Sequence, residues 1–145
     1  MTDVPDWQEA VVGAGGVPVG GLGYFFKVNG TAQTITPSGV VLITTDSLAI
    51  GTYLFAADIT MTFGTGIFDS WSIVVNPGTA TLSVNDFPGI SGTYSGLNTF
   101  TNTLVGPVKI TAAGTVVIEG FVGSHTTGIT ASGYLTVLGP IVATL

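Results

Sequence analysis

Between residues 52 and 63 apolar and polar positions alternate along the chain, and this is the longest regular pattern in the sequence. The apolar members of the alternation are Tyr53, Phe55, Ala57, Ile59, Met61 and Phe63. A period of two residues is typical of a β-strand with one buried face, whereas a helix repeats its apolar positions every three and four residues. The pattern therefore predicts a long central strand of a β-sandwich, with these six side chains in its core.

Shorter segments before this strand carry further strand signals. Residues 24–28 and 31–35 flank the Asn-Gly dipeptide at 29–30, which favours a tight type I′ turn, so we expect a β-hairpin here. The turn at 36–39 leads into the apolar run 40–43. Because this run is apolar without interruption, it predicts a strand that is buried on both sides.

After the central strand, the sequence predicts a second hairpin and then a weakly patterned stretch. Residues 70–75 alternate, and the Asn-Pro-Gly turn at 76–78 leads to a further alternation over 80–84. Turn chemistry of this kind normally joins two antiparallel strands of one sheet. Residues 85–106 show little periodicity, and we expect one short strand near 97–104 within them.

The last part of the chain again has clear strand patterns, at 108–111, 116–122 and 133–138. A closing strand of this kind normally lies in the middle of a sandwich, where it fixes the end of the chain. With 22 glycines and seven prolines between Thr- and Val-rich runs, the whole pattern predicts an all-β fold. We expect an antiparallel β-sandwich of about 8–10 strands in two sheets, formed by residues 23–145 as one domain.

Residues 1–22 differ from the rest of the chain in composition. They contain three of the eight acidic residues within the first nine positions, followed by a cluster of glycines at 13–21. This composition predicts an extended N-terminal arm and a Gly-rich hinge outside the sandwich. Trp7 on such an arm either inserts into a neighbouring subunit or partner, or folds back on its own domain. Our candidate partner-binding residues are Pro5, Asp6 and Trp7.

The scarcity of charge limits the possible partners. Only 7% of the residues are charged, against about 25% in an ordinary soluble domain. A small domain of this kind normally hides part of its surface in an assembly, although a monomer covered by Ser and Thr hydroxyls is the alternative. With two lysines, no arginine and a net charge of −6, we expect no nucleic-acid partner and no membrane partner. The expected partners are proteins or a neutral sugar.

Side chains that could perform catalysis are few and scattered. His125 is the single histidine, and no Gly-x-Ser-x-Gly elbow supplies a nucleophile for it. The acids beyond the arm are Asp46, Asp58, Asp69, Asp86 and Glu119, and their spacing favours neither a glycosidase pair nor a calcium loop. We therefore expect no enzyme activity, no catalytic residue, no cofactor and no metal site.

Two segments offer aromatic side chains to a neutral sugar, residues 64–69 with Trp71 and residues 87–100 with Tyr94. Trp71, however, alternates in phase with the apolar positions of its own strand. This phase favours a core position for Trp71 over a sugar platform.

The order of these features resembles the jelly roll of the complement globular-head and tumour necrosis factor superfamily. Three segments carry the resemblance: 31–35 leading into the sandwich, the Gly-Thr-Tyr-Leu-Phe strand that begins at Gly51, and the closing Ser-Gly-Tyr-Leu-Thr-Val at 132–137. The resemblance covers about residues 31–142, and the segment 85–106 departs from the family's middle strands. It implies a compact homotrimer with aromatic and apolar side chains packed along the three-fold axis.

Jelly rolls of this type, with few charges and an acidic arm, are also similar to virion proteins of tailed bacteriophages. The opening Val4-Pro5-Asp6-Trp7 is similar to the start of structural and minor tail proteins of phages of actinobacteria. The resemblance implies a structural virion protein that decorates the outer surface of a phage particle, as a capsid decoration or minor tail protein attached through its arm. The alternative is a host-glycan-binding adhesin, or receptor-binding domain, at the tail tip.

Overall fold

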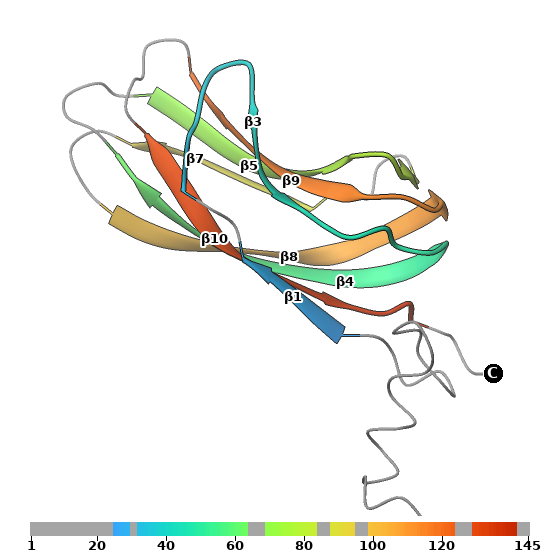
Figure 1. Ribbon diagram of the computed structural model, residues 1–145. Helices are drawn as coiled ribbons and strands as arrows, with labels where there is room; N and C mark the ends of the chain where they lie inside the picture. Colours follow the sequence, from blue (N-terminus) through green and yellow to red (C-terminus); the bar gives the residue numbers. More distant parts are fainter. Residues whose placement is uncertain are drawn as a thin grey trace, which may run out of the picture.

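The computed structural model describes residues 25–29, 32–63, 69–83, 88–94, 99–123 and 129–141, which form ten strands and no helix. The strands are β1 (Phe25–Asn29), β2 (Gln33–Thr34), β3 (Val40–Thr44), β4 (Gly51–Thr62), β5 (Asp69–Pro77), β6 (Thr81–Leu82), β7 (Gly89–Tyr94), β8 (Thr99–Ala112), β9 (Val116–Val122) and β10 (Thr130–Leu138). They form two layers that face each other (Figure 1). The prediction of an all-β sandwich with eight to ten strands is confirmed.

The larger sheet has six strands in the order β1-β10-β4-β8-β6, with β2 also paired to β10. The smaller sheet has four strands in the order β3-β9-β5-β7, and every strand pair in both sheets is antiparallel. From β2 to β5 and from β7 to β10, consecutive strands alternate between the two sheets. This alternation produces the two Greek keys of a jelly roll, as expected.

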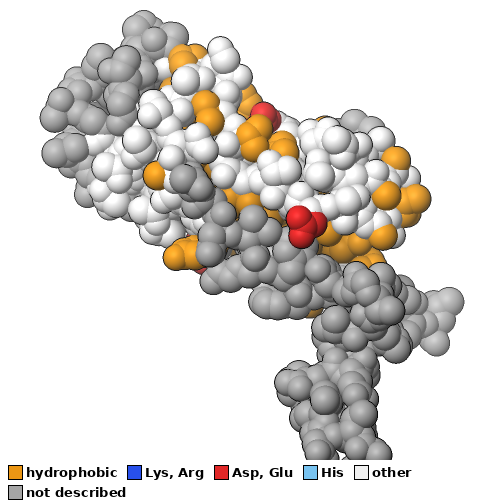
Figure 2. Space-filling model, in the orientation of Figure 1, with side chains coloured by type: hydrophobic (Ala, Val, Ile, Leu, Met, Phe, Trp, Pro, Cys, Tyr) orange, Lys and Arg blue, Asp and Glu red, His pale blue; other side chains and the backbone are white. Residues whose placement is uncertain are grey.

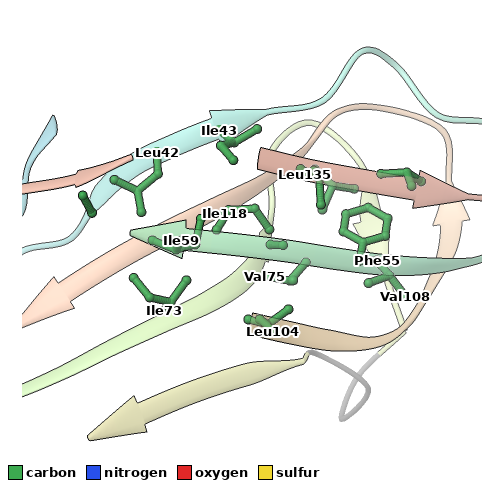
Figure 3. Close-up of a cluster of buried hydrophobic side chains, with 14 of the residues drawn as sticks. Leu42, Ile43, Phe55, Ile59, Ile73, Val75, Leu104, Val108, Ile118 and Leu135 are labelled. Atoms are coloured by element: carbon green, nitrogen blue, oxygen red, sulfur yellow. The ribbon is translucent and has the colours of Figure 1, made fainter. Parts of the chain in front are cut away.

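The core lies between the two sheets, where side chains from both layers point toward one another (Figure 3). Strand β4 supplies Tyr53, Phe55, Ala57, Ile59 and Met61, all of which are buried, and Phe63 just after the strand is buried as well. Ile73 and Val75 of β5 and Ile118 of β9 contribute from the smaller sheet. The predicted face of the central strand is therefore confirmed, and so is the buried position of Trp71.

The predicted hairpin around Asn29-Gly30 is wrong. Asn29 of β1 pairs with Tyr134, and Gln33 of β2 pairs with Ala131, so both short strands run antiparallel to β10 in the same direction. The local preference of the Asn-Gly dipeptide for a tight turn gives way to pairing with the last strand. The chain thus covers one edge of β10 with two successive short strands.

The apolar run at 40–43 also differs from its prediction, because β3 is an edge strand of the smaller sheet and is not buried on both sides. The ladder between β3 and β9 shifts register between Val41 and Ile43. This bulge lets Leu42 and Ile43 both be buried although they are adjacent in sequence, while Val41 stays 41% exposed. The turn before the strand forms as expected, since the Gly39 amide donates to the Thr36 carbonyl at 3.1 Å.

The predicted hairpin across residues 76–78 is wrong as well. Strand β5 belongs to the smaller sheet and β6 to the larger one, so the chain crosses between the sheets at residues 78–80. The Thr115 carbonyl accepts from the amides of Gly78 and Ala80, each at 3.0 Å, and Thr79 and Thr115 exchange side-chain hydrogen bonds. These contacts hold the crossing segment against the start of β9.

The weakly patterned stretch contains two strands where one was expected. Strand β7 was not anticipated, and the predicted strands near 97–104 and 108–111 are parts of the single 14-residue strand β8. Gly106 and Pro107, which suggest a break, lie inside β8. A Cβ at Gly106 would lie 2.7 Å from the Pro88 Cβ, so glycine at this inward position makes room for the proline.

The closing strand β10 lies between β1 and β4 in the larger sheet, which confirms its predicted place inside the sandwich. Three predicted segments lie outside the described residues: the arm at 1–22, the loop at 64–68, and Val84 at the end of the alternation over 80–84.

Candidate interface on the outer face of the larger sheet

The outer face of β10, β4 and β8 is a regular array because the three strands are paired along the whole length of β10. Outward positions of the three strands line up in rows across the sheet. From one end of the array to the other, the rows are Leu138-Leu54-Pro107, Thr136-Ala56-Val105, Tyr134-Asp58-Thr103, Ser132-Thr60-Thr101 and Thr130-Thr62-Thr99. Neighbouring strands lie about 4.8 Å apart and successive rows about 6.8 Å apart.

The first two rows form an apolar half of this face. Val105 is 59% exposed, Leu138 39% and Leu54 36%, and Pro107 is also exposed. Ala56 lies between Thr136 and Val105 and is half-buried. The strand alternation places all of these side chains away from the core, so the sandwich itself does not bury them.

The last two rows form a hydroxyl-rich half. Thr60 and Thr101 share a side-chain hydrogen bond of 2.8 Å, and Thr62 and Thr99 share one of 3.1 Å. Such cross-strand threonine pairs stabilise the sheet locally, and their side chains are uncharged.

Charge is nearly absent from this face. Asp58 in the middle row accepts a hydrogen bond of 2.7 Å from the Thr103 hydroxyl, and exposed Lys109 lies beyond the apolar half, opposite Thr52. Within β10, β4 and β8 the two apolar rows carry no charged side chain between Asp58 and Lys109, and in the neighbouring strand β1 Lys27 pairs with Thr136 of the second row. Burying these rows against another protein surface therefore requires no desolvation of an ion.

Exposed large hydrophobic residues gather on the larger sheet. In the described part of the chain they are Ile50, Leu54, Val105, Tyr134, Leu138 and Ile141 on or directly beside β10, β4 and β8, with Val41 alone on the smaller sheet. Ile141 is tied to the start of β4, because its amide donates to the Thr52 carbonyl at 2.6 Å. On the side of the molecule shown in Figure 2, uncharged atoms predominate and acidic side chains are few. A clustered apolar surface of this kind is a candidate protein interface.

The sequence pattern contained a signal for this face. Leu54 and Ala56 are apolar at positions where the alternation of β4 predicts polar, outward residues. Val105 and Leu138 gave no such signal, because the sequence did not establish which side chains of their strands point away from the core. Which outward residues meet in one row depends on strand order, and this order is set by non-local pairing.

The sequence-predicted site residues that the structure describes lie apart from one another. Pro5, Asp6 and Trp7 lie outside the described residues, as do His125, Asp86 and the side chains of Asp69 and Tyr94. Asp46 is exposed after β3, and Asp58 is exposed on the outer face of the larger sheet. Glu119, on the smaller sheet, accepts a hydrogen bond from the Asn76 amide group.

Within the described ranges, no group of three or more His, Cys, Asp or Glu side chains is arranged to hold a metal ion. The same ranges contain no helix of the length and hydropathy that a membrane span requires.

Comparison with known proteins gives no family for this chain. No protein-family model matches it, and no curated protein matches it. Among solved structures, a chain of the T13 IBDV viral particle is similar, with a TM-score of 0.49 and 10% sequence identity over 84% of this chain. The match covers 32% of the viral chain, so this protein spans about a third of that chain's length. The similarity is one of overall shape, and no functional conclusion is taken from it.

Proposed function

We propose that this protein is a structural component of a virion, a homotrimer that decorates the outer surface of a tailed bacteriophage particle on its capsid or tail. The observation that carries the proposal is the uncharged apolar half of the outer face of β10, β4 and β8. A protein of this size with so few charges reaches a stable, soluble state when such a face is covered by another subunit.

Two further features support the same proposal. The strand order is a jelly roll, as the resemblance to the complement globular-head and tumour necrosis factor superfamily implies, and that resemblance also implies a trimer. The low charge, acidic arm and opening Val-Pro-Asp-Trp sequence are similar to those of phage structural proteins. Attachment to capsid or tail proteins is assigned to the arm at 1–22.

The oligomeric state is the first test of the proposal. Multi-angle light scattering at micromolar concentration should give about three times the 14.6 kDa mass of one chain. A mass of one chain at that concentration contradicts the trimer.

The face itself is tested by Val105→Glu, which places a carboxylate in the apolar half. We expect this variant to sediment as a monomer, because burying an unpaired charge costs several kcal/mol. Val41→Glu is the matched control, since Val41 is also an exposed strand valine but lies on the smaller sheet. A trimer that survives Val105→Glu, or that dissociates equally with both variants, would place the interface elsewhere.

The virion role is tested by measuring the protein in purified particles. We expect it to be present in virions and to bind particles that lack it. Many copies per particle would indicate capsid decoration, whereas a handful would indicate the tail. Absence from the particle contradicts the proposal, whatever the oligomeric state.

A further inference from the structure

A hollow of about 250 Å³ lies on the outer face of the smaller sheet, away from the candidate interface. It is lined by Ser70, Trp71, Ser72, Ser91, Phe121 and Val122. Ser91, Ser72 and Phe121 are partners in one row across β7, β5 and β9, so the hollow is built on three adjacent strands. The strands are rigid parts of the sandwich, and their pairing fixes the spacing of the lining side chains.

The Phe121 ring is held in place by the turn that precedes β3. Thr36 forms a β-bridge with Phe121, and a Cβ at Gly39 would lie only 2.4 Å from the phenyl Cε1 atom. Gly39 also has a φ of 88°, a conformation that favours glycine. The turn therefore packs directly against the ring, which is half-buried and keeps part of its surface at the hollow.

The chemistry of the lining is aromatic and hydroxylic. Ser70 and Ser91 are exposed and Ser72 is half-exposed, and each hydroxyl can both donate and accept a hydrogen bond. None of the described residues that line the hollow is charged, so these residues supply no counter-charge for a phosphate, a carboxylate or a metal ion. The net charge of −6 further disfavours anionic ligands.

A neutral sugar fits this combination. One face of a pyranose ring is formed by C–H groups that pack on an aromatic ring, and its hydroxyls pair with side chains that both donate and accept. The volume is below the roughly 300 Å³ at which pockets for drug-sized ligands begin, which suits one sugar unit. We propose that this hollow binds a single unit of a neutral glycan, with Phe121 as the stacking platform and Ser72 and Ser91 as hydrogen-bonding partners.

This binding site goes beyond the structural role and does not depend on it. The hollow and the candidate interface lie on opposite outer faces of the sandwich, so a subunit that has assembled through β10, β4 and β8 keeps the hollow accessible. The Val105→Glu variant separates the two proposals, because we expect it to bind sugar as the unaltered protein does whether or not a trimer forms.

The test is saturation-transfer NMR of the full chain with methyl glycosides of glucose, galactose and N-acetylglucosamine. We expect saturable transfer to at least one of them, with a dissociation constant of about 1 mM, as is reasonable for a single unit held by few contacts. Transfer should be strongest to the protons of the sugar face that packs on Phe121. Absence of transfer to all three sugars at concentrations well above this value overturns the proposal.

Two variants locate the site. Phe121→Leu keeps an apolar side chain against Gly39 but removes the aromatic ring, and Ser91→Val removes a hydroxyl from an exposed strand position. We expect at least tenfold weaker binding for each. Thr44→Val, an exposed hydroxyl removed from the edge strand β3, is the matched control and should bind as before. Unchanged binding in folded Ser91→Val overturns the assignment even if Phe121→Leu fails to fold.

Discussion

At the scale of single residues, the two faces of β4 differ in what each side chain contributes. Phe55 has no exposed surface and packs in the core between the sheets, whereas Thr60 lies on the outer face and shares one hydrogen bond with Thr101. Core burial contributes several kcal/mol for an aromatic residue, whereas an exposed hydroxyl pair contributes about 1 kcal/mol or less.

We therefore expect Phe55→Ala to lower the free energy of unfolding by about 3 to 5 kcal/mol, and Thr60→Ala by less than about 1 kcal/mol. Chemical unfolding at one fixed protein concentration measures both changes. A larger effect for Thr60→Ala would contradict the register of β4, since a shift by one residue exchanges its two faces.

Gly133 illustrates a constraint of a different kind, the close approach of two backbones. It pairs with Ile59, and a Cβ at this position would lie 2.0 Å from the Asp58 carbonyl oxygen. Because the obstacle is backbone, a side chain here can be accommodated only if β10 and β4 move apart.

Gly133→Ala should accordingly destabilise the protein by about 1 to 3 kcal/mol, through displacement of the paired strands. Gly89→Ala is the matched control, because its Cβ would lie 3.2 Å from the Val74 Cγ1 atom and no closer than 3.6 Å to backbone. Similar unfolding midpoints for the two variants would show that β10 and β4 adjust to the extra atom at little cost.

At the scale of strands, the sequence predicts buried faces well and strand partners poorly. The alternation of β4 and β5 predicted which of their residues lie in the core, because a period of two depends only on which face is covered. Both predicted hairpins failed, since an Asn-Gly or Pro-Gly turn is a local preference while the sheet to which a strand belongs is decided by distant segments. The candidate interface could not be predicted for the same reason, because each of its rows joins residues from three strands whose pairing is not local.

Strand β3 shows how a bulge gives an edge strand the uninterrupted apolar sequence of a fully buried strand. Its two adjacent buried residues resemble a strand covered on both sides, but the register shift places them both against the core while Val41 faces outward. Charged residues are tolerated on the outer side of an edge strand, where lysine also discourages unwanted pairing.

Val41→Lys should therefore change the unfolding midpoint little, whereas Ile43→Lys should unfold the protein or lower its stability by more than about 3 kcal/mol. Circular dichroism during thermal unfolding distinguishes the two. If Val41→Lys is as damaging as Ile43→Lys, the strand is covered on both sides as its sequence suggests.

At the scale of the whole molecule, the proposed assembly gives the two parts of the chain different roles. The sandwich associates with other subunits in the trimer, and the arm attaches the trimer to the particle. The sandwich has a core of its own between two sheets, formed in the described part of the chain by residues from Ile35 to Val137. The acids and glycines of residues 1–22 have no strand pattern to join it.

Deletion of residues 1–22 should leave a folded trimer that no longer binds the particle. Trp7→Ala alone should weaken attachment by about 2 kcal/mol or more, because a buried indole is often the dominant contact of an interface. Binding to purified particles and the melting temperature of the free protein are the two measurements. A truncated protein that melts many degrees lower, or that still decorates particles fully, would assign attachment to a face of the sandwich.

The central place of β10 has a consequence for synthesis. The partners of β10 on one side, β1 and β2, and on the other, β4, are all translated before it. While the ribosome is still reading the codons for residues 130–138, the nascent chain exposes the β4 edge together with its apolar side. Unpaired edges of this kind are where growing chains associate wrongly. The larger sheet can therefore close only when β10 has left the exit tunnel, and a chaperone that shields β4 until then would raise the yield of folded protein.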